Sequence, residues 1–88
     1  MSQLTILGSS NAIPSLNHEN THMVLAENDG LILIDCPGNP IVRLRQAELD
    51  PLDLEHLVLT HFHPDHISGA PSLLMQSWLL GREKPMTV

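Results

Sequence analysis

The stretch LTHFHPDHISG constrains this chain more than any other, because it places three histidines and an aspartate within six positions. The four side chains are His61, His63, Asp65 and His66. They follow at once on the continuous apolar run LVLT at 57–60, which is typical of a strand covered on both faces. The sequence therefore predicts that the cluster lies at the carboxyl end of a buried strand.

Three further strands are predicted from apolar runs bounded by turn residues. They cover residues 4–7, 22–27 and 31–35, and NDG at 28–30 has the composition of a hairpin turn between the last two. A loop rich in Gly, Ser, Asn and Pro is expected over 8–20. The closing residues KPMTV look like the start of another strand, which suggests a fragment of a larger sheet.

The first predicted helix starts at Asn39-Pro40, where Asn39 suits the N-cap and proline the first helical position. Ile41 and Leu44 give it an apolar face, and Asp50-Pro51 is expected to stop it.

The second predicted helix begins at Pro71 and ends at Gly81, which suits a left-handed C-cap. Its Leu, Met and Trp stripe, including Leu74 and Trp78, is expected to face the core.

Length and charge narrow the class of protein. A chain of 88 residues is at most one small domain with a modest core. Ten acidic against four basic residues give a net charge of −6, which argues against a broad nucleic-acid footprint and means that an anionic substrate would need bound cations. The single cysteine, Cys36, excludes an internal disulfide, and no apolar run is long enough for a membrane span or has the layout of a signal peptide. We expect a reducing, cytoplasmic setting.

The chemistry of the histidine cluster favours a catalytic metal site. Imidazole and carboxylate together suit zinc, with manganese or iron as alternatives, and a site without thiolate is more often catalytic than structural. His61 and His63 project to the same side of an extended segment and can grip one ion, whereas Asp65 and His66 lie beyond the bend at Pro64 and can hold a second. Two ions about 3.5 to 4 Å apart favour hydrolysis, because they can activate a shared water.

THFHPDH resembles the metal-binding signature of the metallo-β-lactamase fold superfamily. The segments LGSSNAIPS, ENTHMVL, LIDCPG, DPLDLEHLVLTH and ISGAPSLL resemble, in that order, the amino-terminal half of its ribonuclease Z branch, the endonucleases that trim the 3′ ends of tRNA precursors. The resemblance covers nearly the whole chain. It implies an αββα sandwich, an α/β fold of which residues 1–88 would form the amino-terminal part.

Residue by residue, the resemblance implies that His61 and His63 bind a first metal and that Asp65 and His66 bind a second. It also implies that Asp65 helps to move protons during phosphodiester cleavage. Asp35 matches an aspartate that orients the histidine loop by contacting the metal ligands and not the metal itself. A simple turn cap is the alternative role for Asp35.

The superfamily completes its site with a further histidine, a bridging aspartate and a last histidine from the later half of the domain. No His or Asp follows His66 in this chain, and it has nothing like the basic arm with which ribonuclease Z holds tRNA. We therefore expect each half-site to be short of protein donors. Pairing with a missing carboxyl-terminal half, or with a second copy as a homodimer, would supply them.

The leading prediction for function is a metal-dependent hydrolase of phosphodiesters, with RNA or a small phosphodiester as substrate. A lactonase-like or other ester hydrolase of the same fold is the alternative enzyme, and a metal-binding or interaction module without turnover is the alternative from another class.

Other polar residues have more ordinary expected roles. The lone histidines His18, His22 and His56 are expected to be surface or helper residues. Cys36 is expected to be an inert thiol, because it has no basic neighbour in the sequence. LGSS is too common a strand-to-loop turn to indicate a phosphate site.

Overall fold

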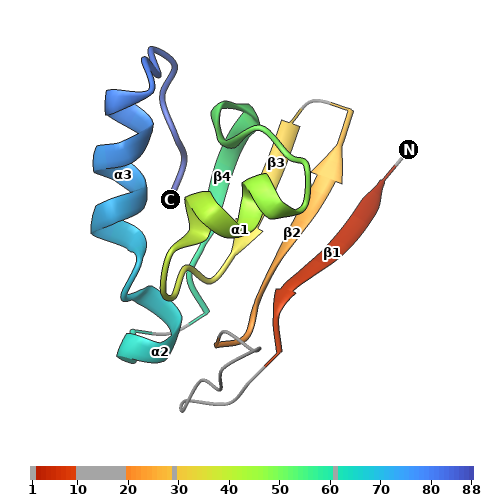
Figure 1. The fold of residues 1–88 in the computed structure, drawn as a ribbon, viewed down its shortest axis with the longest axis vertical. Helices are drawn as coiled ribbons and strands as arrows, with labels where there is room; N and C mark the ends of the chain where they lie inside the picture. Colours follow the sequence, from red (N-terminus) through yellow and green to blue (C-terminus); the bar gives the residue numbers. More distant parts are fainter. Residues whose placement is uncertain (1, 10–19, 29, 61) are drawn as a thin grey trace.

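A computed structural model of the chain describes residues 2–9, 20–28, 30–60 and 62–88. The first strands precede all the helices, and the last strand lies between helices along the chain, as Figure 1 shows. In chain order the elements are β1 (Gln3–Gly8), β2 (His22–Glu27), β3 (Gly30–Ile34), α1 (Pro40–Gln46), the 3₁₀ helix η1 (Pro51–Asp53), β4 (Leu54–Val58), α2 (Pro64–Ile67) and α3 (Ala70–Leu79). The α/β class predicted from the sequence is confirmed. Most of the loop predicted over 8–20 falls outside the described residues.

The strands of the described residues form a four-stranded mixed sheet in the order β1-β2-β3-β4. β2 pairs antiparallel with β1 and with β3, whereas β4 pairs parallel with β3. The hairpin predicted at NDG is confirmed, because Glu27 pairs with Gly30 across the β2–β3 turn. Parallel strands need a crossover, and α1 lies on the connection from β3 to β4.

The carboxyl-terminal residues lie against β4. The Leu57 amide donates to the Thr87 carbonyl at 2.8 Å, and the Thr87 amide donates to the Glu55 carbonyl at 3.1 Å. Lys84 Nζ lies 2.6 Å from Glu55 Oε1 and anchors the segment a few residues earlier. The strand expected to begin in KPMTV is therefore present as one parallel bridge, between His56 and Thr87.

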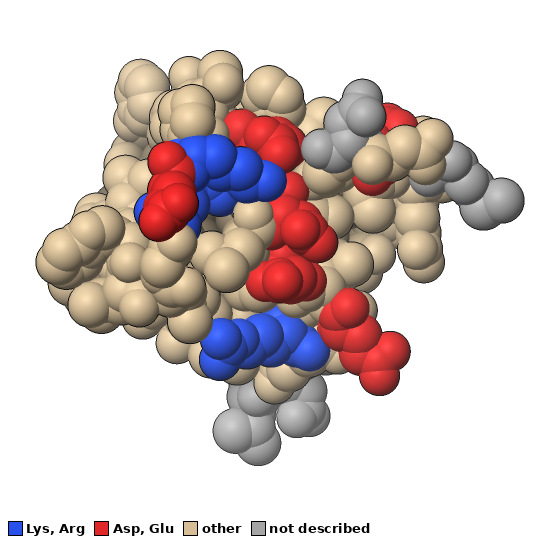
Figure 2. Space-filling view, turned by 90° about the horizontal axis from the view of Figure 1, so that it is seen from above, with Lys and Arg blue, Asp and Glu red and all other residues tan. Residues whose placement is uncertain are grey.

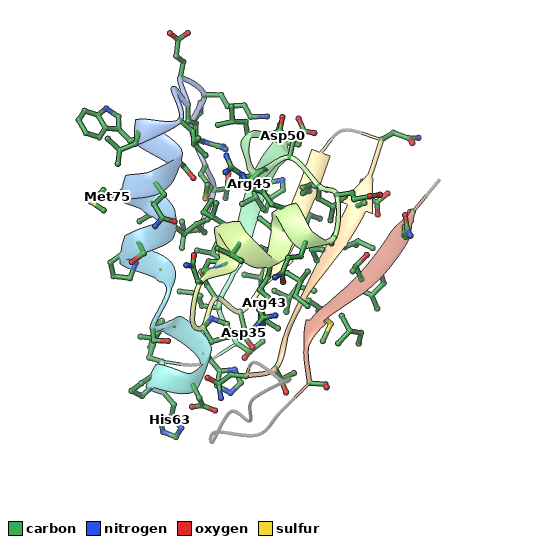
Figure 3. All side chains as sticks on the ribbon, viewed as in Figure 1. Asp35, Arg43, Arg45, Asp50, His63 and Met75 are labelled. Carbon is green, nitrogen blue, oxygen red and sulfur yellow. The ribbon has the colours of Figure 1, made fainter. Side chains whose placement is uncertain are left out.

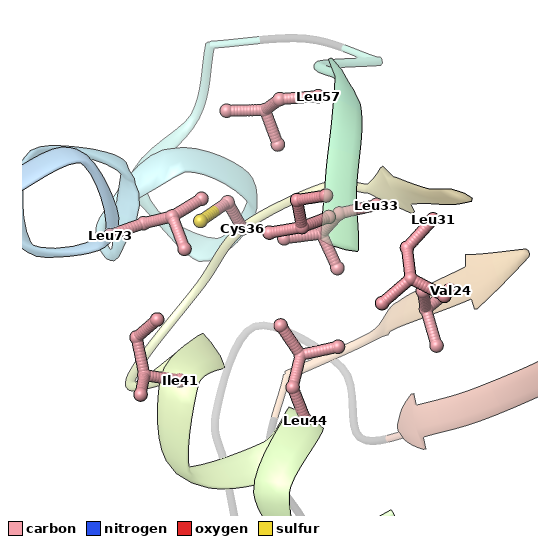
Figure 4. Close-up of a cluster of buried hydrophobic side chains, with 9 residues drawn as sticks. Val24, Leu31, Leu33, Cys36, Ile41, Leu44, Leu57 and Leu73 are labelled. Atoms are coloured by element: carbon pink, nitrogen blue, oxygen red, sulfur yellow. The ribbon is translucent and has the colours of Figure 1, made fainter. Parts of the chain in front are cut away.

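The core lies between one face of the sheet and the helices. In Figure 1, α1 lies over the sheet and α3 runs beside β4. Ile41 and Leu44 of α1 are buried, as predicted, and Leu73 joins them from α3 (Figure 4). The full set of buried apolar residues is Val24, Leu31, Leu33, Cys36, Ile41, Leu44, Leu54, Leu57 and Leu73. Burying each leucine contributes about 1.5 to 3 kcal/mol.

The opposite face of the sheet is apolar and partly open. Cross-strand partners point to the same face, so the pairs Leu4–Leu25 and Leu25–Ile32 define one continuous surface. Leu4 and Ile6 on β1 are 55% and 58% exposed. Covering this face would need a further layer.

The prediction for the strand before the histidine cluster was wrong in position and in burial. β4 runs over Leu54–Val58, three residues earlier at its start than the predicted 57–60. Val58 is 45% exposed and therefore is not covered on both faces. The apolar run LVLT misled because its second half belongs to the loop that follows the strand.

The prediction for α3 was right about its ends and wrong about its buried face. Pro71 lies in the first turn, and Gly81 follows the helix with a φ of 90°. Leu74 and Trp78, expected in the core, are 48% and 72% exposed. Leu73 and Ser77 form the buried side instead. No helix in the described ranges is long and apolar enough to cross a membrane.

Candidate metal centre

The segment with the predicted metal ligands connects β4 to α3 at one end of the sheet. Ile34 of β3 pairs with Val58 of β4, so both parallel strands end at the same edge. Asp35 leaves the first strand there and Thr60 the second. His63 is the N-cap residue of α2, and Asp65 and His66 lie within that helix. Figure 3 shows His63 and Asp35 at the same end of the molecule, with Asp50 at the other.

Asp35 is the buried centre of this arrangement. Its residue is 5% exposed. The Thr60 amide donates to Asp35 Oδ1 at 2.8 Å, and the Thr60 hydroxyl lies 3.0 Å from Oδ1 and 2.8 Å from Oδ2. His66 Nδ1 lies 2.6 Å from Oδ2. These partners are 25 and 31 residues away in sequence, so the carboxylate ties two segments together and is no local turn cap.

The hydrogen bonds decide the ionisation of Asp35. Burial by itself raises the pKa of its carboxyl. The Thr60 amide, the His66 ring and the Thr60 hydroxyl oppose that effect, and the net pKa lies below its ordinary value. Asp35 is therefore an anion at neutral pH, and its carboxylate can accept a hydrogen bond from Nδ1–H of His66.

This contact orients the imidazole of His66. When Nδ1 carries the proton that Asp35 accepts, Nε2 keeps its lone pair and can bind a metal. Nε2 lies 3.3 Å from Asp65 Oδ2. Two donors that each approach a tetrahedral zinc at about 2.0 to 2.2 Å stand about 3.4 Å apart, so this pair fits a shared ion.

Backbone contacts hold α2 against the turn after β3. The Cys36 amide donates to the His66 carbonyl at 2.7 Å, and the Gly69 amide donates to the Cys36 carbonyl at 2.7 Å. The Gly38 amide donates to Ser68 Oγ at 3.1 Å. A Cβ on Gly69 would lie 2.7 Å from the Gly38 carbonyl oxygen, so only glycine fits this approach. The position of His66 is thus fixed through its backbone as well as its ring.

The predicted ligands are only partly placed by the structure. His63 is exposed, and Asp65 and His66 are partly exposed. His61 falls outside the described residues. Among the residues that the structure does describe, no group of three or more His, Cys, Asp or Glu side chains could hold a metal ion. The donor chemistry and the Asp65–His66 spacing fit zinc, whereas a full ligand set is not assembled by the described part of the chain.

Cys36 has no nucleophilic role here. Its side chain is fully buried, and burial raises the pKa of the thiol to about 12, with the Asp35 carboxylate adding to the rise. The expectation of an inert thiol agrees with this environment.

The lone histidines differ from one another. His22 is fully buried, and its Nδ1 lies 2.7 Å from the Asn20 carbonyl oxygen, so it is not a surface residue. His56 is exposed as expected, although it lies within β4 and not before it. His18 falls outside the described residues.

The part that Thr60 plays in this network was not predicted from the sequence. The one feature of the sequence that could have indicated this role is the position of Thr60. It stands directly before His61 and follows β4, the strand that pairs parallel with β3. Ser68 and Gly69 were also missed as contacts of the turn at 36–38.

The fold and this loop define the class: the chain matches the amino-terminal part of metallo-β-lactamase fold proteins. Within that class, a family model described as "Anti-Pycsar protein Apyc1" matches residues 2–87. The chain belongs to this family.

Curated relatives include ribonuclease Z from several organisms. The protein from Methanothermobacter thermautotrophicus is 32% identical over 88 residues, which is 100% of this chain and 29% of that protein. The protein from Aeropyrum pernix is 37% identical over 86 residues, 97% of this chain and 28% of that protein. The chain therefore spans under a third of the length of these relatives.

Solved structures agree with the fold. The short form of human tRNase Z superposes with a TM-score of 0.82 at 30% identity, over 90% of this chain and 30% of that one. The metallo-β-lactamase fold protein YhfI from Bacillus subtilis gives 0.78 at 22% identity, over 93% of this chain and 34% of that one.

Proposed function

We propose that this chain carries the metal-binding loop of a metal-dependent phosphodiesterase. The observation that supports the proposal most is the geometry of His66. Its Nδ1 lies 2.6 Å from the buried Asp35 carboxylate, and its Nε2 lies 3.3 Å from Asp65 Oδ2. An imidazole held by a carboxylate on one side, beside a second carboxylate on the other, is a common arrangement of metal ligands.

Zinc is the proposed metal, with manganese or iron as alternatives. The proposed ligands are His61 and His63 for one ion and Asp65 and His66 for another, and Asp65 is also the proposed proton carrier. When bound, such ions supply Lewis acidity and lower the pKa of water towards about 7. Asp35 keeps His66 in place and accepts a hydrogen bond from its Nδ1–H. No His or Asp follows His66, so the proposal needs further donors from another segment or a second copy.

RNA is the proposed substrate class, with a small phosphodiester as the alternative. The relatives named ribonuclease Z support RNA. The matching family model is described as an anti-Pycsar protein and not as a ribonuclease. Phosphodiesters other than RNA are therefore tested as well. The acidic composition supports metal-assisted binding of any phosphate, because Arg and Lys are few. Figure 2, which views the end opposite α2, shows acidic side chains both between the basic ones and on either side of them.

The experiment assays the natural protein that carries this chain on three substrates: bis-p-nitrophenyl phosphate, a lactone and a short tRNA precursor, with zinc or manganese. The proposal expects cleavage of a phosphodiester that disappears in His66→Ala and in His63→Ala. Leu74→Ala, an exposed change on α3, is the matched control and should keep the activity. Cleavage of the lactone alone would identify an ester hydrolase, and metal binding without any turnover would identify a binding module.

The setting proposed for this reaction is the reducing cytoplasm, which agrees with one buried free thiol at Cys36. The open apolar face of the sheet around Leu4 and Ile6 supports covering by a partner layer, from a homodimer or from a carboxyl-terminal half.

A further inference from the structure

Thr60 occupies the corner between the carboxylate of Asp35 and the ring of His66. Its amide lies 2.8 Å from Asp35 Oδ1, and its hydroxyl oxygen lies 3.0 Å and 2.8 Å from the two carboxylate oxygens. The same hydroxyl oxygen lies 3.4 Å from His66 Nδ1. One residue of the loop thus touches both members of the pair that orients the proposed metal ligand.

The two groups of Thr60 act on different parts of the carboxylate. The amide holds Oδ1, which leaves rotation of the carboxylate plane to be fixed by another contact. Oδ2, the oxygen that accepts from His66, lies 2.8 Å from the hydroxyl. A hydroxyl has one proton and two lone pairs, so it can donate to the carboxylate while presenting a lone pair towards Nδ1–H.

We propose that the hydroxyl of Thr60 is a positioning group, which holds the Asp35 carboxylate so that His66 carries its proton on Nδ1 and offers Nε2 to the metal. This inference rests on the proposed metal centre. Loss of the hydroxyl leaves Oδ2 with one fixed partner and loosens its contact with Nδ1–H. The Asp65 carboxylate, 3.3 Å from Nε2, can then compete for the ring proton, so that both neutral tautomers are populated in the metal-free protein. Outer partners of metal-binding histidines are worth about 10- to 100-fold in metal affinity.

Thr60 can be tested with closely matched variants. Thr60→Val keeps the branched shape and the backbone amide and removes only the hydroxyl, whereas Thr60→Ser keeps the hydroxyl and removes the methyl. Thr60 is exposed, so neither change opens a cavity in the core. His63→Ala serves as the third variant, because it removes a proposed ligand that is not part of the Asp35–Thr60 contact.

Two readouts are taken on the same samples. Zinc affinity is measured by competition with a chelator, and the tautomer of His66 is read from long-range ¹⁵N–¹H correlations of its ring in the metal-free protein. Thr60→Val should lower zinc affinity about 10- to 100-fold and give a mixture of tautomers. Thr60→Ser should restore both to wild-type values. His63→Ala should lower the affinity and leave the tautomer of His66 unchanged.

The outcomes separate this inference from the metal centre itself. If the wild type binds no zinc, the metal centre fails, and the tautomer measurement still decides the role of the hydroxyl. A single Nδ1–H tautomer in Thr60→Val overturns the inference, whatever happens to zinc affinity. Equal losses in the Val and Ser variants also overturn it, because the methyl group would then be responsible.

Discussion

Asp35 combines two features that an ordinary turn residue avoids. It is buried, and its φ of 64° lies in the left-handed region, which Asp and Asn tolerate better than other residues with a side chain. The free-energy costs of the burial and of the left-handed φ are offset by the contacts of the Asp35 carboxylate with Thr60 and His66. These contacts therefore hold a buried charge at a left-handed backbone position, where it can direct an imidazole.

Asp35→Asn tests that role with the backbone preference retained. An asparagine can still accept from the Thr60 amide, but its NH₂ would face His66 Nδ1 and favour the tautomer with the proton on Nε2. We expect zinc affinity to fall about 10- to 100-fold, measured by chelator competition. The free energy of unfolding should fall by about 1.5 to 3 kcal/mol, since charged hydrogen bonds are lost. Unchanged zinc affinity would contradict the orienting role.

Cys36 provides a second test at the residue scale. Because the thiol is buried and its pKa is raised to about 12, the thiolate should be scarce at pH 8. We expect 5,5′-dithiobis(2-nitrobenzoic acid) to react slowly with the native chain and at once after urea is added. Rapid reaction of the native chain would show that the turn at 36–38 opens readily.

Residue roles were predicted unevenly by the sequence. The spacing of His61, His63, Asp65 and His66 predicts metal chemistry without any structure, and this role stays a prediction. The burial of His22 carried no such signal, because its hydrogen bond to Asn20 is set by where β2 begins. The contact between Asp35 and Thr60 joins residues 25 apart, and it became visible only once β3 and β4 were paired.

Among the elements, α3 shows best where periodicity fails. Its apolar residues surround the helix: Leu73 is buried, whereas Leu74, Met75, Trp78 and Leu79 are all 48% or more exposed. A pattern with apolar residues on every side cannot select a buried face. By contrast, β2 was predicted at its observed bounds, 22–27, because turn-forming residues flank its apolar run. The four-residue α2 was not predicted, being too short for a periodic signal.

Neighbouring leucines on α3 give a matched test of this assignment. Leu73→Ala removes a fully buried side chain and should cost about 2 to 5 kcal/mol of unfolding free energy. Leu74→Ala, one position on and 48% exposed, should change it by about 0.5 kcal/mol or less. Urea unfolding of both variants checks the difference. Equal costs would mean that Leu74 packs against a partner in solution.

The carboxyl-terminal segment is tied to β4 by an ion pair that depends on pH. The hydrogen bond from Lys84 holds the pKa of the Glu55 carboxyl below its ordinary value of 4.5. A lowered folded pKa means that this stabilisation is present above the ordinary pKa and is lost as pH falls through the folded value. We expect a ¹³C titration of Glu55 to give a pKa below 4.5 and Lys84→Met to bring it back towards 4.5. No difference between the two proteins would contradict the anchor.

At the scale of the whole molecule, one sheet has a covered face and an open one. α1 and α3 bury the first, whereas Leu4, Ile6 and Val58 on the second are 45% to 58% exposed. The sequence did not indicate which face of the sheet would be open. Of the proposed ligands, His63, Asp65 and His66 lie at one end of this sheet and are exposed or partly exposed.

The loop between β4 and α3 is proposed to bind metal through an oriented His66. Equilibrium dialysis of the wild type and His66→Ala against zinc, followed by metal analysis, measures this binding. We expect the wild type to retain zinc and the variant to lose at least one bound ion, with no matching loss in Leu74→Ala. Equal zinc retention in the wild type and His66→Ala would show that His66 is not a metal ligand.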